Sequence, residues 1–284
     1  MGPGLRPPPR RDNVVTSAPR WPGDSRAACA FTFDLDAETL WMARGIREPV
    51  ALSQGRFGPT EALPRILDLL KAAAMRGSFF IPAWVAEHYP DAVKAIVAGG
   101  HEVGCHGDEH ELVSELDAAQ EEQILTKSLK VLTTHAGRRP TGYRAPGWQL
   151  SPRTLGLLAR HGFDYSSNMM DRLTPYLHPP IDGATLVEIP VSWVLDDAPY
   201  FLFTGQRSLE PPGAVLQSWL TEFDGISEAG GVTNFTFHPQ LIGRPSRLAC
   251  LRELVEYVRR TPRIWVASLA EISTHWRAAV AAQR

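Results

Sequence analysis

The chain has 284 residues, of which 44% are hydrophobic and 21% charged, and its formal net charge is −2. The near balance of opposite charges, with no basic block, argues against a nucleic-acid partner. No apolar run approaches the ~20 residues that a membrane-spanning helix needs, so we expect no membrane partner.

Residues 1–26 are rich in Pro, Arg and Gly, which predicts an extended or disordered N-terminal arm. The segment lacks the apolar centre of a secretory signal, so we expect a cytoplasmic protein. Residues 27–284 are expected to form a single domain, because α/β barrels reach this length as one unit. The cysteines at positions 29, 105 and 250 are widely spaced among apolar residues, and we expect buried free thiols.

Short apolar runs alternate with amphipathic segments along the rest of the chain. Strands are expected at 27–33, 77–81, 101–105, 141–143, 163–166, 186–189, 233–237 and 263–266. Helices are expected at 61–75 (capped by Thr60), 90–98, 117–135, from Ser151 onward, and at 214–228, 246–260 and 268–281. Between residues 34 and 60 no period persists, which predicts a long ordered loop over the mouth of a site. The alternation predicts an α/β fold with a parallel sheet covered by helices.

Polar side chains directly follow several of these strands. They are Asp34 and Asp36 after the first strand, His106 and His110 after the third, Arg144 after the fourth and His238 after a late one. Each cluster alone has an ordinary structural explanation as a cap, a turn or a loop residue. In parallel sheets, however, functional groups collect at the C-terminal ends of the strands. We therefore expect these clusters to meet in one site.

The histidine pair suggests a metal site. His106 and His110 are four positions apart, so both imidazoles can lie on one face of a helical turn and reach one ion. An aspartate from the first cluster would complete a two-histidine, one-carboxylate site with open positions for water and substrate. These donors suit zinc, with cobalt, nickel, iron or manganese as alternatives.

Such a site could hydrolyse amides. A bound metal ion lowers the pKa of water and polarises a carbonyl. The second aspartate could accept the proton of the water, with Arg144 holding that carboxylate ionised, and His238 could protonate the departing nitrogen. A different interpretation reads His106-x-x-Glu109-His110 as the motif of inverted zinc peptidases, with Glu109 as the base. That motif needs a long helix, which Gly107 would interrupt.

Taken together, the motifs resemble those of the polysaccharide deacetylase family, the carbohydrate esterases with a chitooligosaccharide-deacetylase homology domain. The resemblance covers nearly the whole chain from Ala27 onward. The matching segments are Phe31-Thr32-Phe33-Asp34-Leu35-Asp36 for the first motif, His106 with His110 for the second, Arg144-Ala145-Pro146-Gly147-Trp148 for the third and Phe237-His238-Pro239-Gln240 for the fifth. Residues 186–193 occupy the place of the fourth motif, but its aspartate is absent and only Trp193 is recognisable.

The resemblance implies an irregular (β/α) barrel of about seven parallel strands. It also implies a metal-dependent hydrolase of non-peptide carbon–nitrogen bonds, in which a metal-bound water attacks an N-acetyl or cyclic amide or imide carbonyl. By position Asp34 is the base, Asp36 joins the two histidines as a metal ligand, Arg144 steers the base and His238 is the acid.

The leucine between the two aspartates resembles the branch of intracellular peptidoglycan-deacetylase-like proteins and cyclic imide hydrolases, in which homo-oligomers are common. The expected substrate is a small amide, an imide or an N-acetylated sugar. The expected substrate contacts are Trp41, Pro146, Trp148 and Trp193. The alternative from another class is a non-catalytic sugar-binding or small-ligand-binding protein that uses the same cleft.

Overall fold

The structure is a computed structural model that describes residues 21–181, 183–203 and 208–283. Most of the expected N-terminal arm, residues 1–20, lies outside the described part of the chain. Trp21 is buried, with its ring 5.5 Å from that of Trp276, and its indole N–H donates to the carbonyl of Gly230. The end of the 1–26 segment is therefore packed against the domain.

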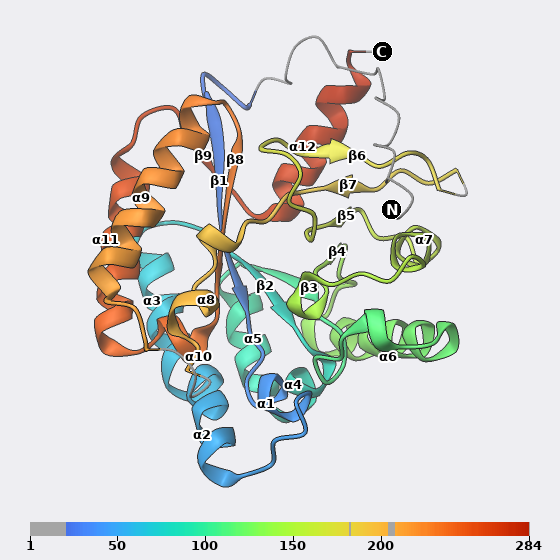
Figure 1. Ribbon diagram of the computed structural model, residues 1–284. Coiled ribbons are helices and arrows are strands. Elements are labelled where there is room, and N and C mark those ends of the chain that lie inside the picture. Colours follow the sequence, from blue (N-terminus) through green and yellow to red (C-terminus); the bar gives the residue numbers. More distant parts are fainter. Residues whose placement is uncertain (1–20, 182, 204–207, 284) are drawn as a thin grey trace, which may run out of the picture.

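The core of the fold is one curled sheet with helices on its outer side (Figure 1). Its strands are β1 (Ala27–Asp34), β2 (Ser78–Ile81), β3 (Glu102–Cys105), β4 (Gly142–Tyr143), β5 (Tyr165–Ser166), β6 (Tyr176–Leu177), β7 (Val187–Glu188), β8 (Val232–Phe237) and β9 (Ile264–Val266). The order across the sheet is β6-β7-β5-β4-β3-β2-β1-β8, with β9 beside β1. The β6–β7 pair is antiparallel and the other pairs are parallel. The expected α/β barrel-like fold of parallel strands is confirmed, in the form of a half-barrel.

Strand β1 is central because it pairs with three other strands. One edge pairs with β8 along most of its length, and the other edge pairs with β9 near its start and with β2 near its end. All eight residues of β1 are buried. A strand covered on both faces and both edges needs a nearly continuous apolar sequence, and Ala27–Phe33 has one. The first ionisable side chain after the buried cysteine of this strand is Asp34, at the C-terminal edge of the sheet.

The helices connect and cover these strands. They are α1 (Thr39–Met42), α2 (Pro49–Phe57), α3 (Leu63–Ala72), α4 (Ala83–His88), α5 (Pro90–Ala98), α6 (Ala118–Ala136), α7 (Thr154–Arg160), α8 (Ala198–Phe201), α9 (Pro212–Glu228), α10 (Pro239–Ile242), α11 (Pro245–Arg260) and α12 (Leu269–Ala281). Short 3-10 turns lie at η2 (Val113–Glu115), η3 (Pro146–Trp148) and η4 (Trp193–Leu195). Within the described part of the chain, no helix is both long and apolar enough to cross a membrane.

The expectation of a long loop between residues 34 and 60 is wrong. The segment contains α1 and α2, and α2 continues through a π-helical turn, η1 (Gly58–Ala62), into α3. Helix α1 has only one turn, which is too short to show a period, and the buried residue of α2 is Gly55. A Cβ at Gly55 would lie 2.3 Å from the carbonyl oxygen of Ala37. This helix packs by backbone approach, so no apolar stripe marks it in the sequence.

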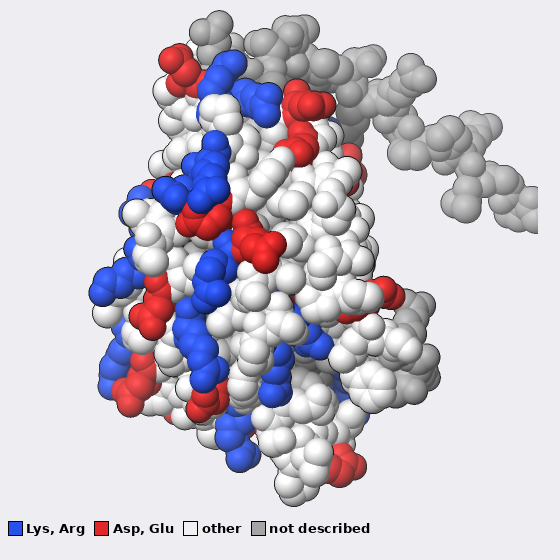
Figure 2. All heavy atoms as spheres, turned by 90° about the vertical axis from the view of Figure 1, so that its left-hand side faces the viewer, with Lys and Arg blue, Asp and Glu red and all other residues white. Residues whose placement is uncertain are grey.

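Thr60 does not cap a helix as expected. It lies inside the continuous helical segment, where its hydroxyl donates to the carbonyl of Arg56. The three cysteines are buried and free, as predicted. On the face that carries α9 and α11, Lys and Arg alternate with Asp and Glu (Figure 2). This mixture gives that face no field of a single sign for a polyanion to recognise.

Candidate active site

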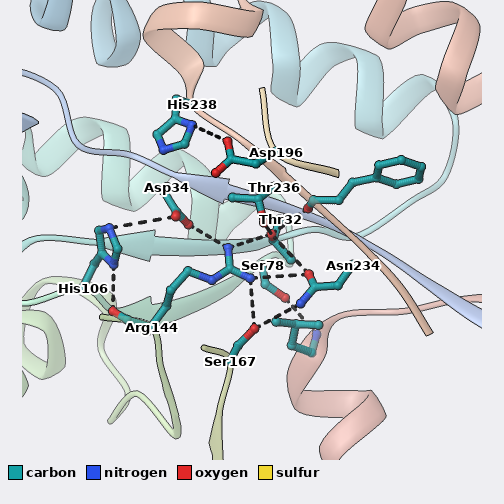
Figure 3. Close-up of polar contacts among 12 residues, drawn as sticks. Thr32, Asp34, Ser78, His106, Arg144, Ser167, Asp196, Asn234, Thr236 and His238 are labelled. Carbon is teal, nitrogen blue, oxygen red and sulfur yellow. Dashed lines mark hydrogen bonds and ion pairs between the residues drawn. The ribbon is translucent and has the colours of Figure 1, made fainter. Parts of the chain in front are cut away.

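The polar clusters that follow separate strands meet at the C-terminal edge of the sheet (Figure 3). The residues brought together are Asp34 at the end of β1, Asp36 two residues later, His106 and His110 after β3, Arg144 after β4 and His238 after β8. All six side chains are buried. Ionisable groups are seldom buried this deeply unless they are paired or functional.

Three of these side chains form a group that can hold a cation. The ligand atoms of Asp36, His106 and His110 all lie within 4.8 Å of one another. Asp36 Oδ1 is 3.5 Å from His106 Nε2 and 3.9 Å from His110 Nε2. Within the described residues, neither Asp36 Oδ1 nor His106 Nε2 has a hydrogen-bond partner. Buried polar atoms without partners are costly, so these residues fit a bound divalent cation well.

Neighbouring groups fix the orientation of these donors. His106 Nδ1 lies 2.7 Å from the carbonyl oxygen of Arg144, which can only accept, so Nδ1 carries the proton and Nε2 presents its lone pair. The side-chain amide of Gln240 donates to Asp36 Oδ2 over 3.4 Å, which leaves Oδ1 free to face the histidines. Burial lowers the pKa of both His106 and His110, which favours the neutral imidazoles that metal binding requires.

The two histidines do not lie on a helical turn, contrary to the expectation from their spacing. The segment from His106 to His110 is a loop in which Gly107 and His110 have positive φ values of 75° and 66°. Helix α4 supports the loop, because the backbone N–H groups of Ala83 and Trp84 donate to the carbonyls of Gly107 and Asp108. The His110 conformation is strained for a residue with a side chain, a condition common at functional sites.

This loop geometry excludes the inverted zinc peptidase interpretation. That motif requires both histidines and the intervening Glu on one helix. Residues 106–110 contain no helix, and the backbone N–H of Glu109 is held by the carboxylate of Glu111.

Asp34 lies in a buried ion pair that its neighbours reinforce. Arg144 Nη1 is 2.8 Å from Asp34 Oδ1 and 2.8 Å from the hydroxyl of Thr32. Arg144 Nη2 donates to Ser167 and Asn234, and the guanidinium lies 4.2 Å over the ring of Phe80. Burial raises the pKa of Asp34, but the charges of Arg144, His106 and His238 and the hydrogen bond from Arg144 together outweigh it and lower this pKa below its ordinary value. Asp34 is therefore held as a carboxylate.

His238 has the opposite electrostatic environment. Its Nδ1 lies 2.6 Å from Asp197 Oδ1 and 3.6 Å from Asp196 Oδ1, and its Nε2 lies 3.7 Å from Asp36 Oδ2. Burial lowers the pKa of His238, but these carboxylates outweigh it, Asp196 most strongly, and raise the pKa well above its ordinary value. The imidazolium form is therefore favoured near neutrality.

Asp196 and Asp197 were missed by the sequence reasoning, which described the aspartate of the fourth motif as absent. The two residues lie just beyond residues 186–193, the place of the fourth motif, three and four positions after Trp193. Asp196 bridges to Thr236 on β8, and the backbone N–H of Asp197 donates to the carbonyl of Thr236. A pair of acidic residues so close to the expected motif was the signal that could have revealed them.

A pocket of about 270 Å³ opens above this cluster. Its lining comprises Asp34, Leu40, Arg44, His106, His110, Gly147, Trp148, Trp193, Asp196, Ala198, Pro199, Leu202 and His238. The rings of Trp148 and Trp193 lie 4.3 Å apart and form part of one wall. Trp41 and Pro146, the other two expected substrate contacts, are buried beside the site and are not part of this lining.

Comparison with known proteins relates the whole domain to amide hydrolases. The family model described as polysaccharide deacetylase matches residues 57–166. A peptidoglycan deacetylase from Helicobacter pylori is 32% identical over 269 residues, covering 84% of this chain and 92% of that protein.

Solved structures agree with this relationship. A Mycobacterium smegmatis protein described as a polysaccharide deacetylase superposes with a TM-score of 0.87 at 37% identity, covering 92% of this chain and 94% of that one. An allantoinase superposes with a TM-score of 0.84 at 27% identity, covering 93% and 95%. The chain thus belongs to the polysaccharide deacetylase family and is a hydrolase of carbon–nitrogen bonds other than peptide bonds.

Proposed function

We propose that this protein is a divalent-cation-dependent amidase that hydrolyses an N-acetyl group or a small cyclic amide or imide. Asp36, His106 and His110 are the residues that would hold the cation. When bound, such a cation lowers the pKa of water and polarises a carbonyl oxygen. Zinc suits two imidazoles and one carboxylate, and cobalt, nickel, iron or manganese are alternatives.

Asp34 and His238 would carry out the proton transfers. Asp34 Oδ2 lies 3.9 Å from His106 Nε2, so it borders the cation site and can accept the proton of the attacking water. Arg144 keeps this carboxylate ionised and fixes its direction. His238 points its Nε2 toward the same site and can donate its proton to the departing nitrogen.

The observation that carries this proposal is the placement of two differently paired groups on the two sides of one cation site: Asp34 Oδ1 lies 2.8 Å from Arg144 Nη1, and His238 Nδ1 lies 2.6 Å from Asp197 Oδ1. The pKa of Asp34 is lowered and that of His238 is raised. Two titratable groups with pKa values pushed apart are typical of a base and an acid that act in one reaction. A purely structural ion-pair network would not need two buried metal-ligand atoms without hydrogen-bond partners, Asp36 Oδ1 and His106 Nε2, between Asp34 and His238.

Two groups of relatives support different amides as the substrate. The peptidoglycan deacetylase similarity favours an N-acetylated sugar, and the allantoinase similarity favours a small cyclic ureide. The pocket volume of about 270 Å³ fits either a single sugar unit or a small ring. We also infer that residues 27–284 form one catalytic domain, because β1 near the start of the chain pairs with β9 near its end.

Metal analysis and a substrate panel test the proposal. Protein purified without chelators should contain about one equivalent of divalent metal, and His106→Ala should lose it. The metal-loaded protein should hydrolyse at least one of a panel of N-acetylated sugars, cyclic imides and ureides. Equal metal content in both proteins would contradict the cation site. Thermal stabilisation by a panel member without any hydrolysis would instead indicate the non-catalytic binding protein.

A further inference from the structure

Arg44 lies on the lining of the active-site pocket, in the turn between α1 and α2. The turn is well anchored, because the buried Trp41 accepts backbone hydrogen bonds from Arg44 and Ile46 at its carbonyl. The guanidinium of Arg47 closes the same turn by donating to the carbonyls of Met42 and Ile46. The backbone of Arg44 is thus fixed while its side chain is exposed to the pocket.

The charge of Arg44 has no partner in the described part of the chain. No carboxylate there lies within ion-pair distance of its guanidinium. The carboxylates of the pocket already have partners at its floor: Asp34 pairs with Arg144, and Asp196 lies beside His238. Arg144 is fully buried beneath them. Among the described residues, Arg44 is therefore the cationic side chain on the pocket lining apart from the reacting groups.

The rest of the lining limits what the ligand can be. It includes the apolar side chains of Leu40, Ala198, Pro199 and Leu202 and the two tryptophans. It includes no Ser, Thr, Asn or Gln side chain from the described residues. A neutral sugar carries several hydroxyl groups, for which this lining offers no neutral polar side chain of these types. A guanidinium beside apolar walls is complementary to a carboxylate on a small, otherwise apolar or planar molecule.

We propose that Arg44 determines substrate specificity by binding a carboxylate, so that the substrate is a small amide, imide or ureide with a negative charge. This inference rests on the proposed amide hydrolysis at the same site. The amide would lie over Asp36 and the two histidines, and the carboxylate would lie at the rim. The pocket of about 270 Å³ is large enough to hold one such molecule.

Pairs of probes that differ in a carboxylate test whether the protein prefers a negatively charged substrate. One pair is hydantoin-5-acetic acid and its primary amide, and the other is N-acetylmuramic acid and the primary amide of its lactyl carboxylate; the two members of each pair have nearly the same shape. The zinc-loaded protein should turn over the anionic member of at least one pair with the higher kcat/KM. Arg44→Gln should lower kcat/KM for that anionic member by ~10- to 100-fold, mainly through KM, because it removes one charge-assisted contact. The same variant should lower kcat/KM for the neutral member much less.

Two further variants serve as controls. Arg44→Lys keeps the charge but not the forked geometry, so it should recover part of the preference. Arg65→Gln removes an exposed arginine that pairs with Glu61 on the helix surface, and it should leave kcat/KM unchanged for both members of each pair. An equal loss for both members in Arg44→Gln, or no preference for the anionic member in the unaltered protein, would overturn the inference.

Binding measurements separate this inference from the proposed reaction. Calorimetry of the four probes is repeated with zinc-loaded Asp34→Asn protein, with and without Arg44→Gln. If no probe is hydrolysed by the unaltered protein but the anionic probes bind more tightly and lose this advantage with Arg44→Gln, the specificity inference stands and the proposed reaction fails. If hydrolysis occurs without any charge preference, the reaction stands and the inference fails.

Discussion

Asp197 holds His238 from two directions. The ring Nδ1 of His238 lies 2.6 Å from Asp197 Oδ1, and the backbone N–H of His238 donates to both oxygens of the same carboxylate at 3.1 Å. The imidazole is therefore fixed in position, and its Nε2 is directed toward Asp36. A proton on this nitrogen is available to a group bound above the cation site.

Asp197→Asn should lower kcat by about 10²-fold with little change in KM, because it removes a charge that keeps His238 protonated and lies outside the pocket lining. The loss should be largest for substrates whose departing amine is strongly basic and most needs a proton. Steady-state kinetics on two amides that differ only in the basicity of the amine provide the measurement. Equal losses for both amides would assign Asp197 a purely structural role.

Asp34→Asn should abolish most turnover, by ~10²- to 10⁴-fold, while the protein still binds its metal. The amide of Asn cannot accept the proton of water, but Asp36, His106 and His110 remain in place. Metal content and kcat are measured on the same preparation. Substantial activity in this variant would remove Asp34 as the base, whereas loss of metal would indicate that it is a ligand.

Gln240→Leu should weaken metal binding by ~10- to 100-fold, because the Gln240 amide orients Asp36 by donating to its Oδ2, the oxygen that does not face the histidines. The zinc dissociation constant is measured by competition with a chelator. Activity should return when excess zinc is added, since the catalytic groups are unchanged. Gln217→Leu on the exposed face of α9 is the matched control and should bind zinc normally. Unchanged zinc affinity in Gln240→Leu would refute this role.

Gly55→Ala should destabilise the fold by about 1–3 kcal/mol, because the new Cβ would clash with the backbone at Ala37. The matched control is Gly225→Ala on the exposed side of α9, where a Cβ meets no other atom. That change should stabilise the protein by ~0.5–1 kcal/mol. Urea unfolding of the three proteins gives the comparison. A Gly55→Ala protein as stable as the parent would mean that α2 can move away from the backbone at Ala37.

His101 should contribute to the loss of stability in mild acid. Burial lowers its pKa below the ordinary value of 6.5, helped by the nearby charge of Arg76, and its Nδ1 accepts the backbone N–H of Gly77. The unfolded chain therefore binds a proton more readily than the folded chain. It follows that the stabilisation is complete above pH 6.5 and declines as the pH falls toward the lowered pKa.

His101→Asn tests this effect, because the Asn side-chain oxygen can accept the same hydrogen bond but cannot titrate. The free energy of unfolding is measured in urea at about pH 7.5 and about pH 5.5, on either side of the ordinary histidine pKa. The variant should lose less stability between the two values than the parent does. An identical loss would show that other groups cause the acid sensitivity.

The sequence by itself determined the fold class and most of the strand-end groups. Strand β1 carries no charged residue before Asp34 because both its faces and edges are buried, so the first carboxylate marks the place where the strand reaches the open edge of the sheet. Parallel strands all present their C-terminal ends to the same edge, and topology alone therefore brought Asp34, His106, Arg144 and His238 together.

The tertiary structure decided the parts that depend on distant or aperiodic contacts. Asp197 reaches His238 across 41 positions, a pairing that no local pattern encodes. Helix α2 packs through Gly55 without an apolar stripe, and His110 reaches Asp36 through a strained loop in place of a helical turn. These features follow from close approach of backbone segments, which leaves little periodic signal in the sequence. The same packing sets the position of Arg44 over the site, which a local motif could not reveal.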